Sequence, residues 1–142
     1  MLHGRRRGRS ATVSVAVATV LMVLAGAGCG AARAPDVRGT ATQFLRAVSD
    51  SDGSAACTLL APRTKAELER SAQAPCEDAV LDQDIPVGGQ VSQTQVWSDQ
   101  AQVRIGSDTV FLAEFPDGWK VVAAACTLRD KTQPYDCRLK GA

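Results

Sequence analysis

The pattern of apolar and polar positions divides the 142-residue chain into an apolar leader, a helical half and a strand-rich half. The leader is a predominantly apolar run from Ala11 to Ala27, preceded by four arginines at positions 5, 6, 7 and 9. A basic end followed by an apolar run is typical of an export signal, and this run is slightly shorter than the roughly 20 residues of a membrane-spanning helix. The arginines are expected to keep the N-terminus on the cytoplasmic side while the rest of the chain crosses the membrane.

The helical half has its main predicted helix at residues 36–49. Apolar side chains recur there at helical spacing and predict one buried stripe, made of Val37, Ala41, Phe44, Leu45 and Val48. Asp36 is expected to cap this helix, although Thr40 to Gln43 also has the pattern of a capping box. A short helix is predicted over residues 54–60, where Ser54 is expected to cap it and Pro62 to end it. Further short helices are predicted over 64–72 and directly after Pro75, and a break follows at 85–89.

The strand-rich half begins after Gly89, where the spacing of apolar residues changes from helical to alternating. The turn sequence Pro116-Asp117-Gly118 predicts a hairpin. Strands are predicted over residues 91–97, 101–105, 109–115 and 119–126, and the tail over 127–142 is expected to be irregular. Helices followed by a strand meander predict an α+β fold, in which the N-terminal helices pack on a curved antiparallel four-strand sheet.

The leader ends in the sequence Leu24-Ala25-Gly26-Ala27-Gly28-Cys29, which resembles the lipobox of bacterial lipoprotein signals. The small residues before the cysteine fit that pattern, whereas Gly26 stands where Leu, Val or Ile is usual. The resemblance implies that Cys29 carries a diacylglyceryl group and begins the mature chain, anchored to the outer face of the cytoplasmic membrane. Two alternatives remain open: cleavage after Ala27 at an A-x-A site, and an uncleaved membrane helix.

This interpretation divides the chain into a signal peptide at residues 1–28, a short tether at 29–35 and one domain at 36–142. The mature part keeps 12 of the 16 Lys and Arg residues and all 15 Asp and Glu residues, so that its net charge is −3. A mildly acidic domain binds nucleic acid poorly on electrostatic grounds. No nucleic-acid partner is therefore predicted.

The chain has five cysteines, an odd number for an exported protein. Lipidation of Cys29 leaves four, and two disulfides are the expected arrangement in an oxidising compartment. Among the three pairings we favour Cys57–Cys76 and Cys126–Cys137, because each closes a short loop within one half of the chain. A zinc site is disfavoured because C-x-x-C spacing is missing and the only histidine, His3, lies in the leader. Neither a metal nor another cofactor is predicted.

The mature part contains neither histidine nor asparagine, which excludes Ser-His-Asp and Cys-His-Asn catalytic sets. Carboxylates are the remaining candidates for general acid–base chemistry. Glu114 is the catalytic candidate, because it shares a strand face with Val110 and Leu112, where burial would raise the pKa of its carboxyl group. The competing interpretation places Glu114 on the solvent face of an ordinary strand.

Three aromatic residues are candidates for lining a ligand cavity, namely Phe44, Trp97 and Trp119. Such side chains can stack on a ligand, but in helices and strands they also form the core, so both interpretations stay open. The acidic residues Glu77, Asp78, Asp82 and Asp84 lack the pattern of a calcium-binding loop and are interpreted as a solvated helix face.

Three blocks of the mature chain are characteristic in combination. They run from Phe44 to Pro62, from Asp117 to Cys126 and from Pro134 to Cys137. Together with the lipobox they resemble small actinobacterial lipoproteins of unassigned function with an NTF2-like (ketosteroid isomerase-like) domain. The resemblance implies helices packed on a cone-shaped sheet. Enzymes, binding proteins and scaffolds all occur in that superfamily, so the fold does not define the function.

Anchoring, the helix-on-sheet pattern and the missing catalytic residues predict a non-enzymatic, membrane-anchored module of the cell envelope, which binds a small apolar ligand or a partner protein. One alternative is a small-molecule isomerase or lyase with Glu114 as its base, which requires Glu114 to be buried in a cavity. Another is a structural subunit of a membrane complex, which a broad exposed apolar patch would favour.

We expect intact mass spectrometry of the membrane-extracted protein to show a chain that starts at Cys29 and carries acyl chains. The four other thiols should react with an alkylating agent only after reduction, because they form two disulfides. A non-acylated chain that starts at Gly28 would contradict the lipobox interpretation and would leave Cys29 with an unpaired thiol.

Overall fold

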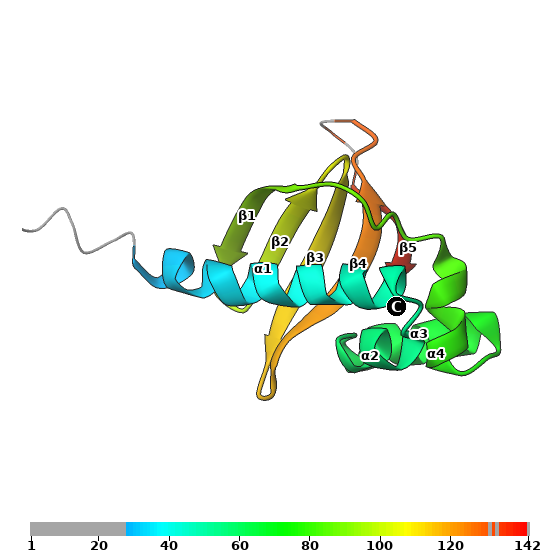
Figure 1. Cartoon of the computed structure of the whole chain (residues 1–142). Helices are drawn as coiled ribbons and strands as arrows, with labels where there is room; N and C mark the ends of the chain where they lie inside the picture. Colours follow the sequence, from blue (N-terminus) through cyan, green and yellow to red (C-terminus); the bar gives the residue numbers. More distant parts are fainter. Residues whose placement is uncertain (1–27, 131, 133, 142) are drawn as a thin grey trace, which may run out of the picture.

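The structure is a computed structural model, and it describes residues 28–130, 132 and 134–141. The leader predicted at residues 1–27 lies outside this part of the chain. One long helix, α1 (Gly28–Ser49), crosses one face of an antiparallel sheet (Figure 1). The predicted α+β class is confirmed, but the sheet has five strands rather than four.

The strands pair in chain order, so that the first and the last form the two edges of the sheet. They are β1 (Val91–Trp97), β2 (Gln100–Ile105), β3 (Asp108–Phe115), β4 (Gly118–Thr127) and β5 (Asp136–Lys140). After α1 and before β1, the chain forms three short helices and a 3₁₀ turn: α2 (Gly53–Thr58), α3 (Pro62–Ala72), α4 (Cys76–Ala79) and η1 (Leu81–Gln83).

The first difference from the sequence prediction concerns the start of α1. We expected the helix to begin at Asp36 after a tether, but residues 28–35 are helical and Pro35 lies inside the helix. Proline lacks the N–H that would bond four residues back, which made Pro35 look like a boundary. The alanines at 31, 32 and 34 favour a helix, and the first turn packs against β1.

The other helix boundaries are set by residues with different roles from those expected. Asp52, not Ser54, caps α2, because its carboxylate accepts a hydrogen bond of 2.9 Å from the Ala55 N–H. Pro62 was expected to end that helix, but it also begins α3, where a missing N–H costs nothing.

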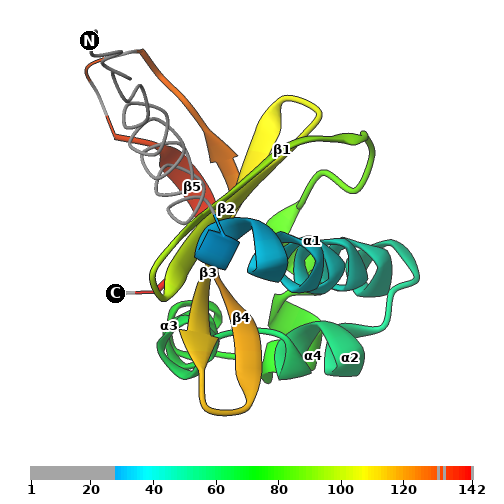
Figure 2. The ribbon, with the colours of Figure 1, turned by 90° about the vertical axis from the view of Figure 1, so that its left-hand side faces the viewer.

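The core lies between α1 and the inner face of the sheet. The predicted stripe of α1 is confirmed, since Val37, Ala41 and Phe44 are fully buried. They belong to one cluster with Val103 of β2 and Leu112 of β3. α1 covers this face. On the opposite face, β2 and β3 carry no helix in the described part of the chain (Figure 2).

The predicted irregular tail instead forms the fifth strand. β5 pairs with β4 in an antiparallel register that places Leu139 opposite Ala124. Leu139 is 2% exposed, while its neighbours in the strand are mostly polar and exposed or half-buried. An edge strand with a single buried side chain has almost no apolar periodicity, so the sequence pattern did not reveal it.

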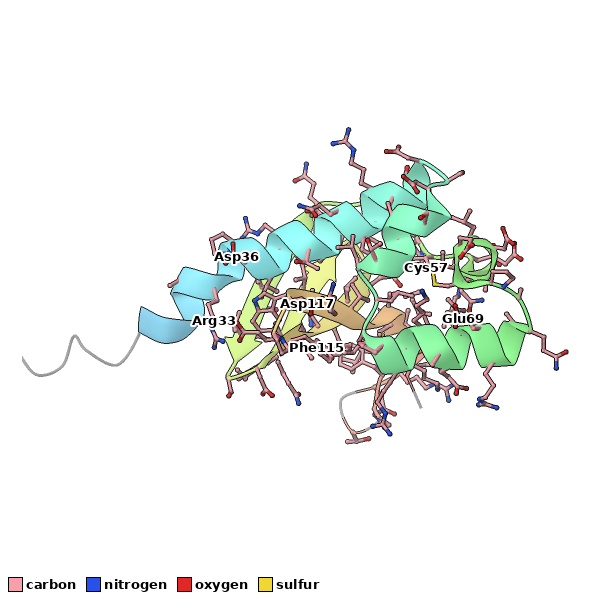
Figure 3. The ribbon with its side chains drawn as sticks, turned by 90° about the horizontal axis from the view of Figure 1, so that it is seen from below. Arg33, Asp36, Cys57, Glu69, Phe115 and Asp117 are labelled. Atoms are coloured by element: carbon pink, nitrogen blue, oxygen red, sulfur yellow. A yellow bond between two sulfur atoms is a disulfide. The ribbon has the colours of Figure 1, made fainter. Side chains whose placement is uncertain are left out.

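Both predicted disulfides are confirmed. Cys57–Cys76 joins α2 to α4, and it is drawn as the yellow bond beside the Cys57 label in Figure 3. Cys126–Cys137 joins directly paired residues of β4 and β5 and so attaches the edge strand to the sheet.

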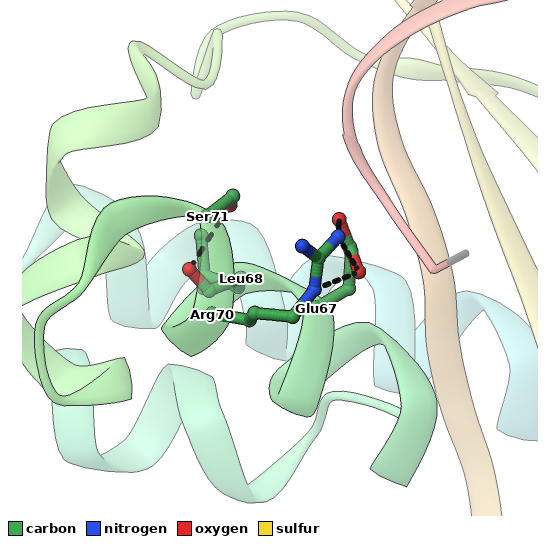
Figure 4. Close-up of polar contacts among 4 residues, drawn as sticks. All are labelled: Glu67, Leu68, Arg70 and Ser71. Atoms are coloured by element: carbon green, nitrogen blue, oxygen red, sulfur yellow. Dashed lines mark hydrogen bonds and ion pairs between the residues drawn. The ribbon is translucent and has the colours of Figure 1, made fainter.

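The small helix α3 is attached to the sheet through its inner face and is polar outside. Leu68 is 3% exposed, and the buried Thr64 hydroxyl donates a hydrogen bond of 2.9 Å to the Val122 carbonyl. On the outer face the Arg70 guanidinium pairs with the Glu67 carboxylate at 2.6 Å, and the Ser71 hydroxyl donates to the Leu68 carbonyl (Figure 4). Exposed ion pairs of this kind add little to stability.

Within the described residues, α1 to α4 include no helix of the length and apolar character needed to cross a membrane.

Replacement of Phe44 by alanine should lower the free energy of unfolding by about 3–5 kcal/mol, because it leaves a cavity under α1. Chemical denaturation monitored by circular dichroism measures this change. The control is Trp97→Ala, whose side chain is 52% exposed and whose loss should cost about 0.5 kcal/mol or less. Equal losses in the two variants would contradict this assignment of the core.

Candidate functional site

The three aromatic residues proposed as cavity-lining side chains are not brought together. Phe44 is fully buried under α1, where it fills the space in which a cone-shaped fold could hold a ligand. Trp119 is 7% exposed and lies near the start of α1. Trp97 pairs with Gln100 at the end of β1 and is 52% exposed. For Phe44, the core interpretation is therefore the correct one.

A hollow of about 410 Å³ lies on the sheet and includes Trp97 in its wall. Residues of β1, β2, β3 and β4 line it, namely Trp97, Gln100, Ala101, Gln102, Phe111, Leu112, Ala113, Val122 and Ala123. Ala101 and Leu112 border the hollow, but both residues are buried in the core cluster. The other seven residues are mostly apolar, and none is ionisable. We call this group the sheet-face hollow.

An irregularity in β3 and β4 shapes the sheet-face hollow. Phe111 pairs with Ala123 and Leu112 with Val121, so that Val122 has no partner residue in β3. Such a bulge bends a strand and redirects its side chains. Here it places two consecutive residues of β4, Val122 and Ala123, in the wall of the hollow.

Polar and aromatic contacts order the surroundings of the sheet-face hollow. The Gln102 amide donates a hydrogen bond of 2.5 Å to the Gln95 side-chain oxygen across β1 and β2. Tyr135 packs edge-on against Phe111, with the ring centroids 4.9 Å apart. Edge-to-face aromatic pairs are favourable beyond their buried area, so Tyr135 helps to fix the Phe111 ring.

Glu114 lies in an exposed position at the end of β3. Its side chain is 40% exposed, and a carboxylate oxygen accepts a hydrogen bond of 2.5 Å from the Arg33 guanidinium. The enzymatic alternative required this carboxyl group to be buried in a cavity, and that requirement is not met. The competing interpretation took the face shared with Val110 and Leu112 as the solvent face, but both of these residues are buried. Glu114 itself is exposed because it lies at the end of that face.

Arg33 is a residue that the sequence reasoning missed. Its guanidinium also donates to the Ser98 carbonyl and lies 5.7 Å from the centre of the Trp119 ring. We call these four residues the Arg33 cluster: Arg33, Ser98, Glu114 and Trp119. The sequence reasoning missed Arg33 because it was assigned to a tether and lies 81 residues from Glu114 in the chain. The one available signal was the alanine-rich segment around it, which favours a helix.

The acidic residues singled out in the sequence do not form a metal site. Residues 28–130, 132 and 134–141 contain no group of three or more His, Cys, Asp or Glu side chains placed to hold a metal ion. Glu77 and Asp78 lie in the first turn of α4, where carboxylates interact favourably with the helix N-terminus.

Comparison with protein-family models, with curated proteins and with solved structures finds no match to this chain. The site is therefore described by its geometry alone. The candidate site is an apolar hollow on the sheet face opposite α1, beside the Arg33 cluster that fastens the start of α1.

A double-mutant cycle with Arg33→Ala and Glu114→Ala should give a coupling energy of about 0.5–1 kcal/mol, because the pair is only partly exposed and shares its arginine with Trp119. The matched control is the Arg46–Asp50 pair on the outer face of α1, whose side chains are 83% and 63% exposed. This control should show little or no coupling. Equal coupling in both cycles would contradict a structural role for the Arg33 cluster.

Proposed function

We propose that this protein is an exported lipoprotein, held through Cys29 on the outer face of the cytoplasmic membrane, and that it acts as a non-enzymatic binding module. The sheet-face hollow is the single observation that carries the binding role. Exposed apolar surface of this kind often marks a site of interaction.

A partner protein of the envelope fits the sheet-face hollow better than an enclosed small molecule. Small-molecule sites usually bury most of the ligand surface. The hollow lies on a sheet face, whereas the space between α1 and the sheet is filled by side chains such as Phe44 and Leu112. Aromatic residues and few charges are typical of the centre of a protein interface, and the hollow has Phe111 in its wall and no ionisable residue.

We also propose that the domain is an NTF2-like cone. Two features support this relationship: a long helix with a buried stripe, and a meander of antiparallel strands that packs on it. The binding role does not depend on this relationship, because that superfamily hosts several kinds of function.

Site-specific photo-crosslinking in membranes of the native host tests the binding role. Gln102→p-benzoylphenylalanine places the reactive group in the sheet-face hollow, and Glu69→p-benzoylphenylalanine places it at a half-buried position of α3 that does not line the hollow (Figure 3). We expect one discrete protein adduct from position 102, no such adduct from position 69, and loss of the adduct when Phe111→Ala is added.

Three outcomes separate the interpretations. Adducts of the same size from both positions, or none from position 102, would overturn the binding role of the hollow. An adduct of lipid mass from position 102 would assign the hollow to a small apolar ligand instead. A lasting adduct to one integral membrane subunit, in fixed stoichiometry, would favour the structural-subunit alternative.

A further inference from the structure

The start of α1 is fixed to the sheet rather than free. Gly30 lies so close to β1 that a Cβ atom added to it would be 3.3 Å from the Val96 carbonyl oxygen. Three residues later, the Arg33 guanidinium contacts Glu114, the Ser98 carbonyl and the Trp119 ring. The first two turns of α1 therefore have a defined position relative to the sheet.

The predicted membrane anchor joins the chain at this same point. The apolar leader ends at Ala27, and α1 begins at Gly28, with Cys29 in its first turn. An acyl anchor on Cys29 and an uncleaved apolar leader would both place the membrane-embedded group directly before α1. Arg33 lies four residues after Cys29, a rise of only about 6 Å along a helix axis, so little slack separates the anchor from the sheet.

One rim of the molecule surrounds this point. We define the docking rim as the first turn of α1, the β1–β2 turn at residues 97–100 and the β3–β4 turn at residues 115–118. Figure 1 shows the β3–β4 turn at the lower end of the sheet, on the side where α1 lies, and Figure 3 views this side with Arg33, Phe115 and Asp117 labelled. Trp97, the most exposed large apolar side chain reported for the described residues, belongs to this rim.

We infer that the protein rests on the lipid bilayer through the docking rim, with Trp97 at the level of the lipid headgroups and α1 as a rigid link between the anchor and the sheet. This inference rests on the proposed function, because it needs a membrane-embedded group at the start of α1. Tryptophan is favoured at this depth since its ring is apolar and its N–H can still donate to water or headgroups.

The charges of the docking rim indicate which forces hold it on the bilayer. The docking rim carries two acidic side chains, Asp99 and Asp117, and no basic one. The basic side chains next to the rim are paired: Arg33 with Glu114 at 2.5 Å, and Lys120 with Asp117 at 3.1 Å. The hydrogen bond from Lys120 lowers the pKa of the Asp117 carboxyl group. Attraction to anionic lipids therefore contributes little, and docking should not weaken as the salt concentration rises.

Fluorescence of the anchored protein tests the inference. The chain has two tryptophans, and Trp119→Phe leaves Trp97 as the reporter. The protein, extracted with its native anchor, is reconstituted in phosphatidylcholine vesicles with and without brominated acyl chains. We expect bromine to remove roughly half of the Trp97 emission, because a ring at headgroup level contacts the upper acyl chains. This loss should be the same at low and high salt.

The matched control moves the reporter to the far end of the sheet. Trp97→Phe, Trp119→Phe and Leu128→Trp together place the only tryptophan just beyond the last residue of β4, at a site that is 50% exposed with leucine. The ten residues of β4 separate this site from the docking rim by roughly 30 Å, so its emission should not change with bromine. If Trp119→Phe does not fold, the loss of emission with brominated lipid is measured for the unmodified chain and for Trp97→Phe. The difference between these two losses is then the contribution of Trp97.

The outcomes distinguish the docking rim from the anchor. Flotation with the vesicles and selective quenching of Trp97 support the inference. Flotation with equal quenching at positions 97 and 128, or with none at either, overturns docking while the anchor stands. A chain that does not float overturns the anchor and the docking inference together.

Discussion

The burial of one helix stripe against one sheet face is the interaction on which the other features of this fold depend. Val37, Ala41 and Phe44 are fully buried, and they bring α1 across the inner face of the sheet. A single long helix covers that face, and Phe44 is fully buried among the core side chains beneath it. The apolar side chains that can still meet a partner lie on the opposite face, around the sheet-face hollow.

The two ends of the domain are fastened by different means. At the start, the Arg33 cluster holds the first turns of α1 on the sheet through an ion pair, a backbone acceptor and an aromatic ring. At the end, Cys126–Cys137 holds β5, which buries only Leu139 among its five residues. A disulfide is a reasonable device there, because it restricts the unfolded chain without requiring further apolar area.

The sequence predicted the features that depend on local pattern. The stripe of α1 and strands β1 to β4 have clear periods, and the disulfide pairing followed from loop length. The predicted start of α1 was wrong because Pro35 resembles a helix boundary. In the structure, packing of the first turns against β1 outweighs the one hydrogen bond that Pro35 lacks. β5 was missed since Leu139 alone carries no period. The contact of Arg33 with Glu114 joins residues 81 positions apart, and local patterns do not report such contacts.

Amide hydrogen exchange over residues 36–39, in the soluble chain without an acyl group, tests most directly whether α1 is one continuous helix fixed at its start. If α1 begins at Gly28, amides 36–39 bond to carbonyls of the preceding turn and should exchange slowly, like those at 41–48. If the helix begins at Asp36, these amides lack such partners. Exchange at unprotected rates over 36–39, with 41–48 still protected, would contradict the account and restore a flexible tether between the anchor and the domain.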